Sequence, residues 1–192
     1  MKKIAILAVL ALASTAFADD KKPAAMEMPK PAAELSGVKF FVGDFNCTGK
    51  SFASPMGPEH ATKATVKAKM DLNGFFLSGR YQETKTAGNP MPVTFAFVWG
   101  WDAMAKKIAG TGQDSFGGMA TQTSAGWEGD KMVFTGDAVW GTDKSAVRDT
   151  FTKKGENELV HLGEMQVKGQ WTSLDEETCT RAMKATTKAA KK

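Results

Sequence analysis

The stretch "VTFAFVWGWD", residues 93–102, carries the plainest structural pattern of the chain, because its large apolar side chains stand at alternate positions. Successive side chains of a β-strand point to opposite faces, so five of them share one face: Val93, Phe95, Phe97, Trp99 and Trp101. If four aromatic side chains faced solvent, they would leave a large apolar patch on a soluble protein. We therefore expect a strand whose aromatic face lines the inside of a β-structure.

The rest of the chain repeats this organisation in strand-length segments separated by turn residues. In "ATKATVKAKMDL", residues 61–72, polar and apolar positions alternate as in a strand with one wet face. Similar segments continue to residue 181, joined by short loops that many of the 19 glycines supply. This even spacing predicts an all-β fold, either a sandwich or a barrel, and the consecutive hairpin connections favour an antiparallel, up-and-down closed barrel of about ten strands. A short helical turn is expected in residues 34–43, before the first strand.

The N-terminus has the three parts of a secretory signal peptide. Lys2 and Lys3 precede an apolar run, and a small-x-small site ends at Ala18, so we expect cleavage between Ala18 and Asp19. The alternative is a buried N-terminal helix. Asp19 and Asp20 stand where a lipid-anchored protein would carry a cysteine, so we expect no membrane anchor. The sequence thus predicts a periplasmic or secreted protein, and export argues against a nucleic-acid partner.

The predicted organisation has four parts. Residues 1–18 form the signal peptide, and residues 19–33, rich in charge, Ala and Pro, form a disordered linker. Residues 34–182 form the barrel domain, and residues 183–192 form a Lys-rich tail. We expect this protein to be a monomer.

The two cysteines, Cys47 and Cys179, are expected to form a disulfide, because an even count in an exported chain favours pairing. Free buried thiols are the alternative. The two residues lie in the first and last predicted strands, which are neighbours only if the sheet closes on itself. The disulfide is therefore also a test of barrel closure.

The ends of the barrel domain carry a resemblance to a known group of proteins. Gly43-Asp44-Phe45 opens the first strand and Thr180-Arg181 closes the last, which resembles the calycin arrangement of lipocalins, fatty-acid-binding proteins and nitrobindins. In that arrangement the Trp of a G-x-W packs beneath an Arg from the final strand, and Phe45 stands here in place of the Trp. The resemblance implies structural roles for Gly43, Phe45 and Arg181.

A broader likeness covers residues 34–182. The order of "FFVGDFNC", "GFFLSGRY", "GTGQDSFG" and "GWEGDKMVFTG", followed by a strand that ends in "TCTR", resembles a family of exported bacterial proteins of uncharacterised function. This resemblance implies a lipocalin-like barrel. It implies no activity.

The three arginines are candidates for chemistry, because the chain otherwise uses lysine for positive charge. A guanidinium suits a planar, bidentate partner. Arg80 could anchor the carboxylate of an amphipathic ligand, or it could pair with an internal acid. Arg148 and Arg181 could likewise anchor a ligand or pair with an internal acid, and for Arg181 the structural role is favoured. The acids considered as internal partners are Asp102, Asp114 and Asp149.

Catalytic and metal motifs are weak in this sequence. A G-x-S-x-G elbow fails at Gln113, and the acids at 175–177 are adjacent, so neighbours face opposite ways along a strand. No metal-ligand spacing is apparent. Nitrobindin-like barrels hold haem through one histidine, which makes His161 a haem-ligand candidate, and the alternative is a histidine hydrogen-bonded within the wall. An enzyme is the third and least favoured reading, and we expect no metal and no cofactor.

Two functions remain open. In the first, the barrel binds a small apolar or amphipathic molecule in a lumen lined by Phe95, Phe97, Trp99, Trp101 and Arg80. In the second, side chains fill the barrel, and the protein is a structural or interaction module that acts through its surface. A cavity of several hundred Å³ would favour the first function.

Overall fold

A computed structural model of the protein describes residues 27–182 and contains eleven strands. The predicted signal peptide, its Ala18/Asp19 cleavage site, most of the linker and the Lys-rich tail lie outside these residues. The strands are β1 (Gly43–Ser51), β2 (His60–Asp71), β3 (Phe76–Glu83), β4 (Thr94–Asp102), β5 (Lys107–Asp114), β6 (Met119–Ser124), β7 (Trp127–Glu128), β8 (Lys131–Trp140), β9 (Asp143–Lys153), β10 (Glu158–Val167) and β11 (Gln170–Arg181).

Ten of these strands close into an antiparallel barrel. Each strand from β1 to β6 and from β8 to β11 pairs with its sequence neighbour, β6 pairs with β8, and β1 pairs with β11. The two-residue strand β7 pairs only with β8, as an addition to the barrel. The expected all-β, up-and-down closed barrel of about ten strands is confirmed.

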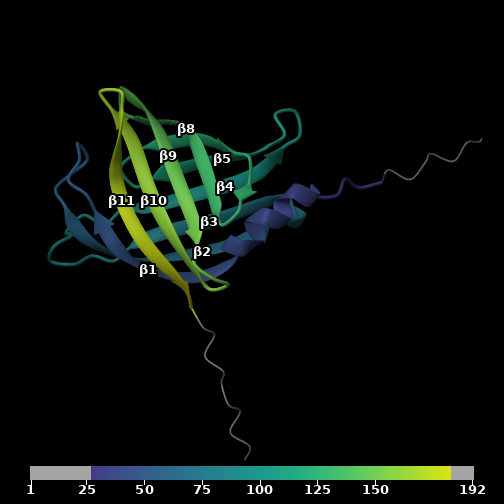
Figure 1. Ribbon diagram of the computed structural model, residues 1–192, viewed down its shortest axis with the longest axis horizontal. Helices are drawn as coiled ribbons and strands as arrows, with labels where there is room; N and C mark the ends of the chain where they lie inside the picture. Colours follow the sequence, from purple (N-terminus) through teal and green to yellow (C-terminus); the bar gives the residue numbers. More distant parts are fainter. Residues whose placement is uncertain (1–26, 183–192) are drawn as a thin grey trace, which may run out of the picture.

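A 3-10 helix, η1 (Ala33–Phe41), lies across one end of the barrel (Figure 1). Leu35, Val38 and Phe41 are its buried residues, and their spacing of three matches the three residues per turn of a 3-10 helix. The indole N–H of Trp127 donates a hydrogen bond of 2.8 Å to the carbonyl of Gly37. The predicted helical turn is thus present and acts as the plug of this end.

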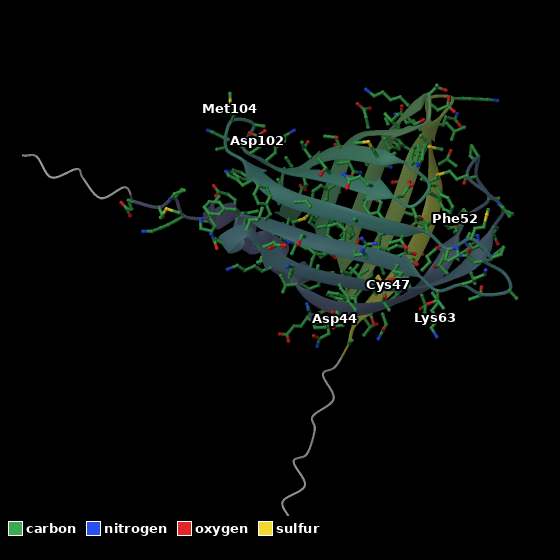
Figure 2. All side chains as sticks on the ribbon, turned by 180° about the vertical axis from the view of Figure 1, so that it is seen from behind. Asp44, Cys47, Phe52, Lys63, Asp102 and Met104 are labelled. Atoms are coloured by element: carbon green, nitrogen blue, oxygen red, sulfur yellow. A yellow bond between two sulfur atoms is a disulfide. The ribbon has the colours of Figure 1, made fainter. Side chains whose placement is uncertain are left out.

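The strands alternate in direction, so each end of the barrel collects a fixed set of loops. Figure 2 shows Asp102 and Met104, on the β4–β5 connection, at the end where η1 lies, and Phe52 toward the opposite end. The opposite end carries the loops 52–59, 84–93 and 115–118. We call the η1 end the closed end and the other end the mouth.

An aromatic cluster fills the closed end. The ring of Phe41 lies 5.0 Å from that of Trp99 and 5.1 Å from that of Phe151, both edge to face. It also stacks on Trp127 at 5.6 Å. Edge-to-face and offset contacts of this kind stabilise beyond simple burial, so the plug is held firmly to the barrel.

The seam between β1 and β11 carries the predicted disulfide. Cys47 and Cys179 are directly opposite each other in the register of the two strands and are bonded through their sulfurs. Both are buried in the core. The expected pairing is confirmed, and it links the first barrel strand to the last.

The same seam contains the contact that the calycin resemblance implies. The guanidinium of Arg181 lies 4.5 Å from the centre of the Phe45 ring and donates hydrogen bonds to the carbonyls of Val42 and Phe40. Gly43 has φ +125°, and a Cβ there would lie 2.7 Å from Nη1 of Arg181. A glycine is therefore required where the chain passes beneath the arginine.

Among the described residues, no helix is long and apolar enough to cross a membrane.

Candidate functional site

The mouth opens into a cavity of about 400 Å³ inside the barrel. All ten barrel strands and η1 contribute residues to its wall. Cavities of this size hold small organic molecules in other proteins. We call this cavity the lumen.

Much of the lumen wall is aromatic. Phe95, Phe97 and Trp99 of β4 line it, together with rings from three other elements: Phe41, Phe134 and Phe151. The alternation that predicts an inward aromatic face on residues 93–102 therefore corresponds to the observed wall.

Glycines on the neighbouring strands explain why these rings leave space. A Cβ added at Gly79 would collide with the ring of Phe97, and one at Gly112 would collide with the ring of Phe95. At Gly110 it would lie 2.8 Å from the ring of Trp99. The rings thus lie flat against the backbone of β3 and β5, so they line the lumen without filling it.

Trp99 forms the floor of the lumen. Its ring lies 4.5 Å from Phe134 and 5.0 Å from Phe41, and only 8% of the residue is exposed. Trp101 lies further toward the closed end, where it packs against the core cluster and does not line the lumen. Three of the four predicted β4 aromatics are therefore brought together in the cavity wall.

Arg80 does not line the lumen, where its predicted role as a ligand anchor would require it to lie. It is exposed on β3, between Gly79 and Tyr81. Because Tyr81 lines the lumen and successive side chains of a strand alternate, Arg80 points outward. Arg148 donates two hydrogen bonds to Glu164, of 2.7 and 2.8 Å. Arg148 is thus paired internally, as one of its two readings expects, but with Glu164 and not with one of the three aspartates considered.

Acidic side chains share the lumen wall with these rings. Six acidic residues contribute to its wall: Glu83, Asp114, Glu164, Asp149, Asp175 and Glu177. Glu164 is neutralised by Arg148. Among the described residues, no lysine or arginine lines the lumen, so the five remaining carboxyl groups share the space with few cations.

Two of these acids hold the loops of the mouth. Glu83 accepts hydrogen bonds from the backbone N–H of Val93, at 2.7 Å, and from the side chain of Asn89, at 2.9 Å. Asp114 accepts from the backbone N–H groups of Phe116 and Gly118 and from the indole of Trp140. Their carboxyl groups are thus engaged by protein donors.

Deeper in the lumen, His161 lies between two acids. Its Nε2 is 2.8 Å from Asp149 and its Nδ1 is 3.1 Å from Asp175, and its ring stacks on Phe151 at 4.8 Å. Burial by itself would lower the pKa of His161, but the charges of and hydrogen bonds to Asp175 and Asp149 outweigh burial and hold it well above 6.5. The two carboxylates thus favour the protonated, cationic form of this histidine.

Glu177 is the most buried acid of the lumen, with 3% of its surface exposed. The phenol of Tyr81 donates a hydrogen bond of 3.0 Å to it. Burial is the main reason that the pKa of Glu177 lies above its usual value of 4.5, and the nearby charge of Asp175 adds to the effect. Burial, with the charges of Glu177 and Glu83, also raises the pKa of Tyr81, so this phenol remains a donor.

The surroundings of His161 do not fit haem. Iron binds a histidine through a ring nitrogen with a free lone pair. Both ring nitrogens of His161 already contact carboxylate oxygens. The alternative reading, a histidine hydrogen-bonded within the wall, describes this residue.

One group of side chains in the described part of the chain has the composition of a metal site. It consists of Cys47, Cys179 and Glu177, whose ligand atoms all lie within 4.8 Å of one another. The two sulfurs are bonded to each other in the disulfide. They offer no thiolate to a metal in this state.

Sequence reasoning does not identify the acidic residues of the lumen, although the signal is present. Adjacent residues of a strand face opposite ways, and this holds for each neighbouring pair among the acids at 175–177. Asp175 and Glu177 are two positions apart, however, so both face inward, and Tyr81 and Glu83 follow the same rule. Period-two spacing of polar side chains would have identified both pairs.

Comparison with solved structures finds chains of similar fold. The crystal structure of Rv2717c from M. tuberculosis matches with a TM-score of 0.61 and 13% sequence identity, covering 80% of this chain and 100% of that one. No protein-family model matches the chain, and no curated protein sequence matches it significantly. At this identity the likeness shows the fold, and the chain is therefore a closed β-barrel protein with a solved structural neighbour.

Proposed function

We propose that this chain is an exported, calycin-like barrel protein that binds a small molecule, apolar over much of its surface, inside the lumen. The observation that carries the proposal is the cavity of about 400 Å³ whose aromatic wall lies flat over glycines. Apolar surface that is buried against such a wall drives binding, and a few polar groups fix orientation.

The mouth supports the proposal. Met56, Met91 and Phe116 line the entrance from three different loops and are 53%, 72% and 59% exposed. Large apolar side chains exposed at the rim of a cavity are typical of a binding site. Methionine is also flexible enough to adapt to a molecule that enters.

The alternative function, a filled barrel that acts only through its surface, has less support. A filled barrel requires layers of side chains across the whole interior, as in small closed barrels. Here such a layer occupies the closed end, and the space between it and the mouth is open.

Binding can be tested with N-phenyl-1-naphthylamine, a neutral apolar dye that fluoresces when it leaves water. Wild-type protein is expected to bind it saturably. Ala120→Trp places a large ring in the lumen and should abolish binding, whereas Thr121→Trp, on the outer face of the same strand, should not. Failure of the wild-type protein to bind the dye, together with native mass spectrometry of protein from its own host that shows only the bare chain, would contradict the proposal.

Export is supported by the signal-peptide pattern of residues 1–18 and by the disulfide, which persists in oxidising compartments. N-terminal sequencing of protein from the periplasm or medium is expected to begin at Asp19. Protein that begins at Met1 in the cytoplasm would contradict export and leave the binding proposal untouched.

A further inference from the structure

We infer that the lumen selects a cationic ligand, an organic ammonium with an apolar body, over neutral and anionic molecules of the same size. This inference rests on the proposed function, because it names the ligand class of the same cavity. It reverses the expectation of a carboxylate ligand held by Arg80.

The charge of the wall is the first argument. Five carboxyl groups line the lumen beside the neutralised Glu164, and among the described residues no lysine or arginine joins them. His161 balances one charge of the Asp149 and Asp175 pair. The lumen is thus acidic in a chain with a formal net charge of +4, and this contrast favours cations inside the barrel.

Glu177 supplies the anchor. It is almost fully buried, it lines the lumen, and none of the described residues forms a salt bridge with it. Its hydrogen bond comes from Tyr81, a neutral donor. A buried carboxyl group without a cation is costly, and a ligand ammonium beside it would supply the missing charge.

A second buried polar group lies beside Glu177. The hydroxyl group of Thr62, which is 5% exposed, lowers the pKa of Glu177 as a neutral hydrogen-bond donor. Thr62 lies in the inward row of β2, between His60 and Val66, which both line the lumen, but Thr62 itself does not line it. Both hydroxyl groups beside the buried carboxyl group, those of Thr62 and Tyr81, are neutral, and neither supplies a positive charge.

The aromatic side fits the same ligand. The faces of Phe97, Trp99 and Phe134 carry negative electrostatic potential, and they attract organic cations as well as apolar groups. Aromatic walls together with carboxylates are the usual means of recognising ammonium ligands.

The test compares three molecules that share one apolar body: 4-phenylbutylamine, 4-phenylbutan-1-ol and 4-phenylbutanoate. Isothermal titration calorimetry at pH 7 measures each with the full mature chain. The amine is expected to bind about tenfold or more tightly than the alcohol, the range of one charge-assisted hydrogen bond, and the carboxylate more weakly than the alcohol.

Two variants locate the preference. Glu177→Gln keeps the shape of the side chain and should remove most of the preference for the amine, with little change for the alcohol. Glu176→Gln, on the exposed face of the same strand, is the matched control and should behave as wild type. Asp175→Asn is the second lumen variant, measured in the same way, so the test does not depend on the folding of one protein.

The outcomes separate this inference from the proposed function. If the alcohol or the carboxylate binds as tightly as the amine, the inference is overturned and lumen binding stands. If neither Glu177→Gln nor Asp175→Asn weakens the preference for the amine, the assigned anchor is wrong. If neither the three molecules nor N-phenyl-1-naphthylamine binds, the proposed function itself fails. Binding of the dye alone also overturns the inference.

Discussion

Tyr81 on β3 donates a hydrogen bond of 3.0 Å to Glu177 on β11, a strand three places away around the barrel. The bond connects two walls of the lumen through its interior. Because burial raises the pKa of Glu177, the folded protein holds the proton of this carboxyl group more tightly than the unfolded chain does.

Glu177→Gln is expected to change how stability depends on pH. A raised pKa in the folded state contributes stability that is complete below the usual value of 4.5 and is lost as pH rises through the folded value. Glutamine mimics the protonated acid at every pH, so the unfolding free energy of the variant should gain on wild type as pH rises above 4.5. Urea unfolding across pH 4–8 measures this, and Glu176→Gln should show no such gain.

His161 should also contribute stability that is lost as pH rises, but in a higher pH range than Glu177. Its pKa is raised well above 6.5, so its contribution to stability is present below pH 6.5 and is lost as pH rises through the folded value. The unfolding free energy of wild type should therefore decrease as pH rises above 6.5. This decrease should be smaller in His161→Gln and unchanged in His60→Gln. NMR titration of the His161 ring provides a direct check, and titration at or below pH 6.5 would contradict this reading.

Gly112→Ala should force the ring of Phe95 off the wall and into the lumen. The added Cβ has no space beneath that ring, and overpacking of this kind costs about 1–3 kcal/mol of stability. Binding of N-phenyl-1-naphthylamine should weaken as well. Gly155→Ala, in a turn where a Cβ would meet nothing within 4 Å, is the control for glycine replacement. Unchanged dye binding by Gly112→Ala would contradict the prediction that the ring of Phe95 moves into the lumen.

Trp99→Ala and Phe97→Ala should differ in cost, although the two rings are neighbours at 5.0 Å. Trp99 is packed on the closed-end cluster, so its truncation should cost about 3–5 kcal/mol. Phe97 has one face on the lumen, so its truncation should cost less and alter dye binding more. Chemical unfolding and dye titration of both variants decide this, and equal costs would contradict an open lumen.

Removal of the disulfide by the double change Cys47→Ala and Cys179→Ala should lower stability by up to about 4–5 kcal/mol. The bond spans 132 positions of sequence, and loops of this length give the largest loss of chain entropy on cross-linking. The register of β1 and β11 should survive, because seven residue pairs hold the two strands together. Chemical unfolding of both proteins, with and without reductant, measures this difference in stability. Reduction of the wild type should remove the difference, because the reduced wild type also lacks the bond.

Several features followed from local sequence pattern alone. The alternation in residues 93–102 predicted a lumen-facing aromatic wall, and Phe95, Phe97 and Trp99 do line the lumen. The cysteine count predicted the Cys47–Cys179 bond and, with it, closure of the sheet. These features repeat with the period of a strand or rest on residue identity, so they can be read along the chain.

Only the tertiary structure decided which end of the barrel is closed and what the lumen contains. Trp101 belongs to the same row as Trp99, yet η1 closes the barrel beside it and removes it from the cavity wall. The flat seating of Phe95 and Phe97 depends on glycines of β3 and β5, which only strand pairing brings beneath them. Tyr81 meets Glu177 across 96 positions of sequence. The physical reason is that strand alternation is a local property of the backbone, whereas cavity shape and charge depend on contacts between distant strands.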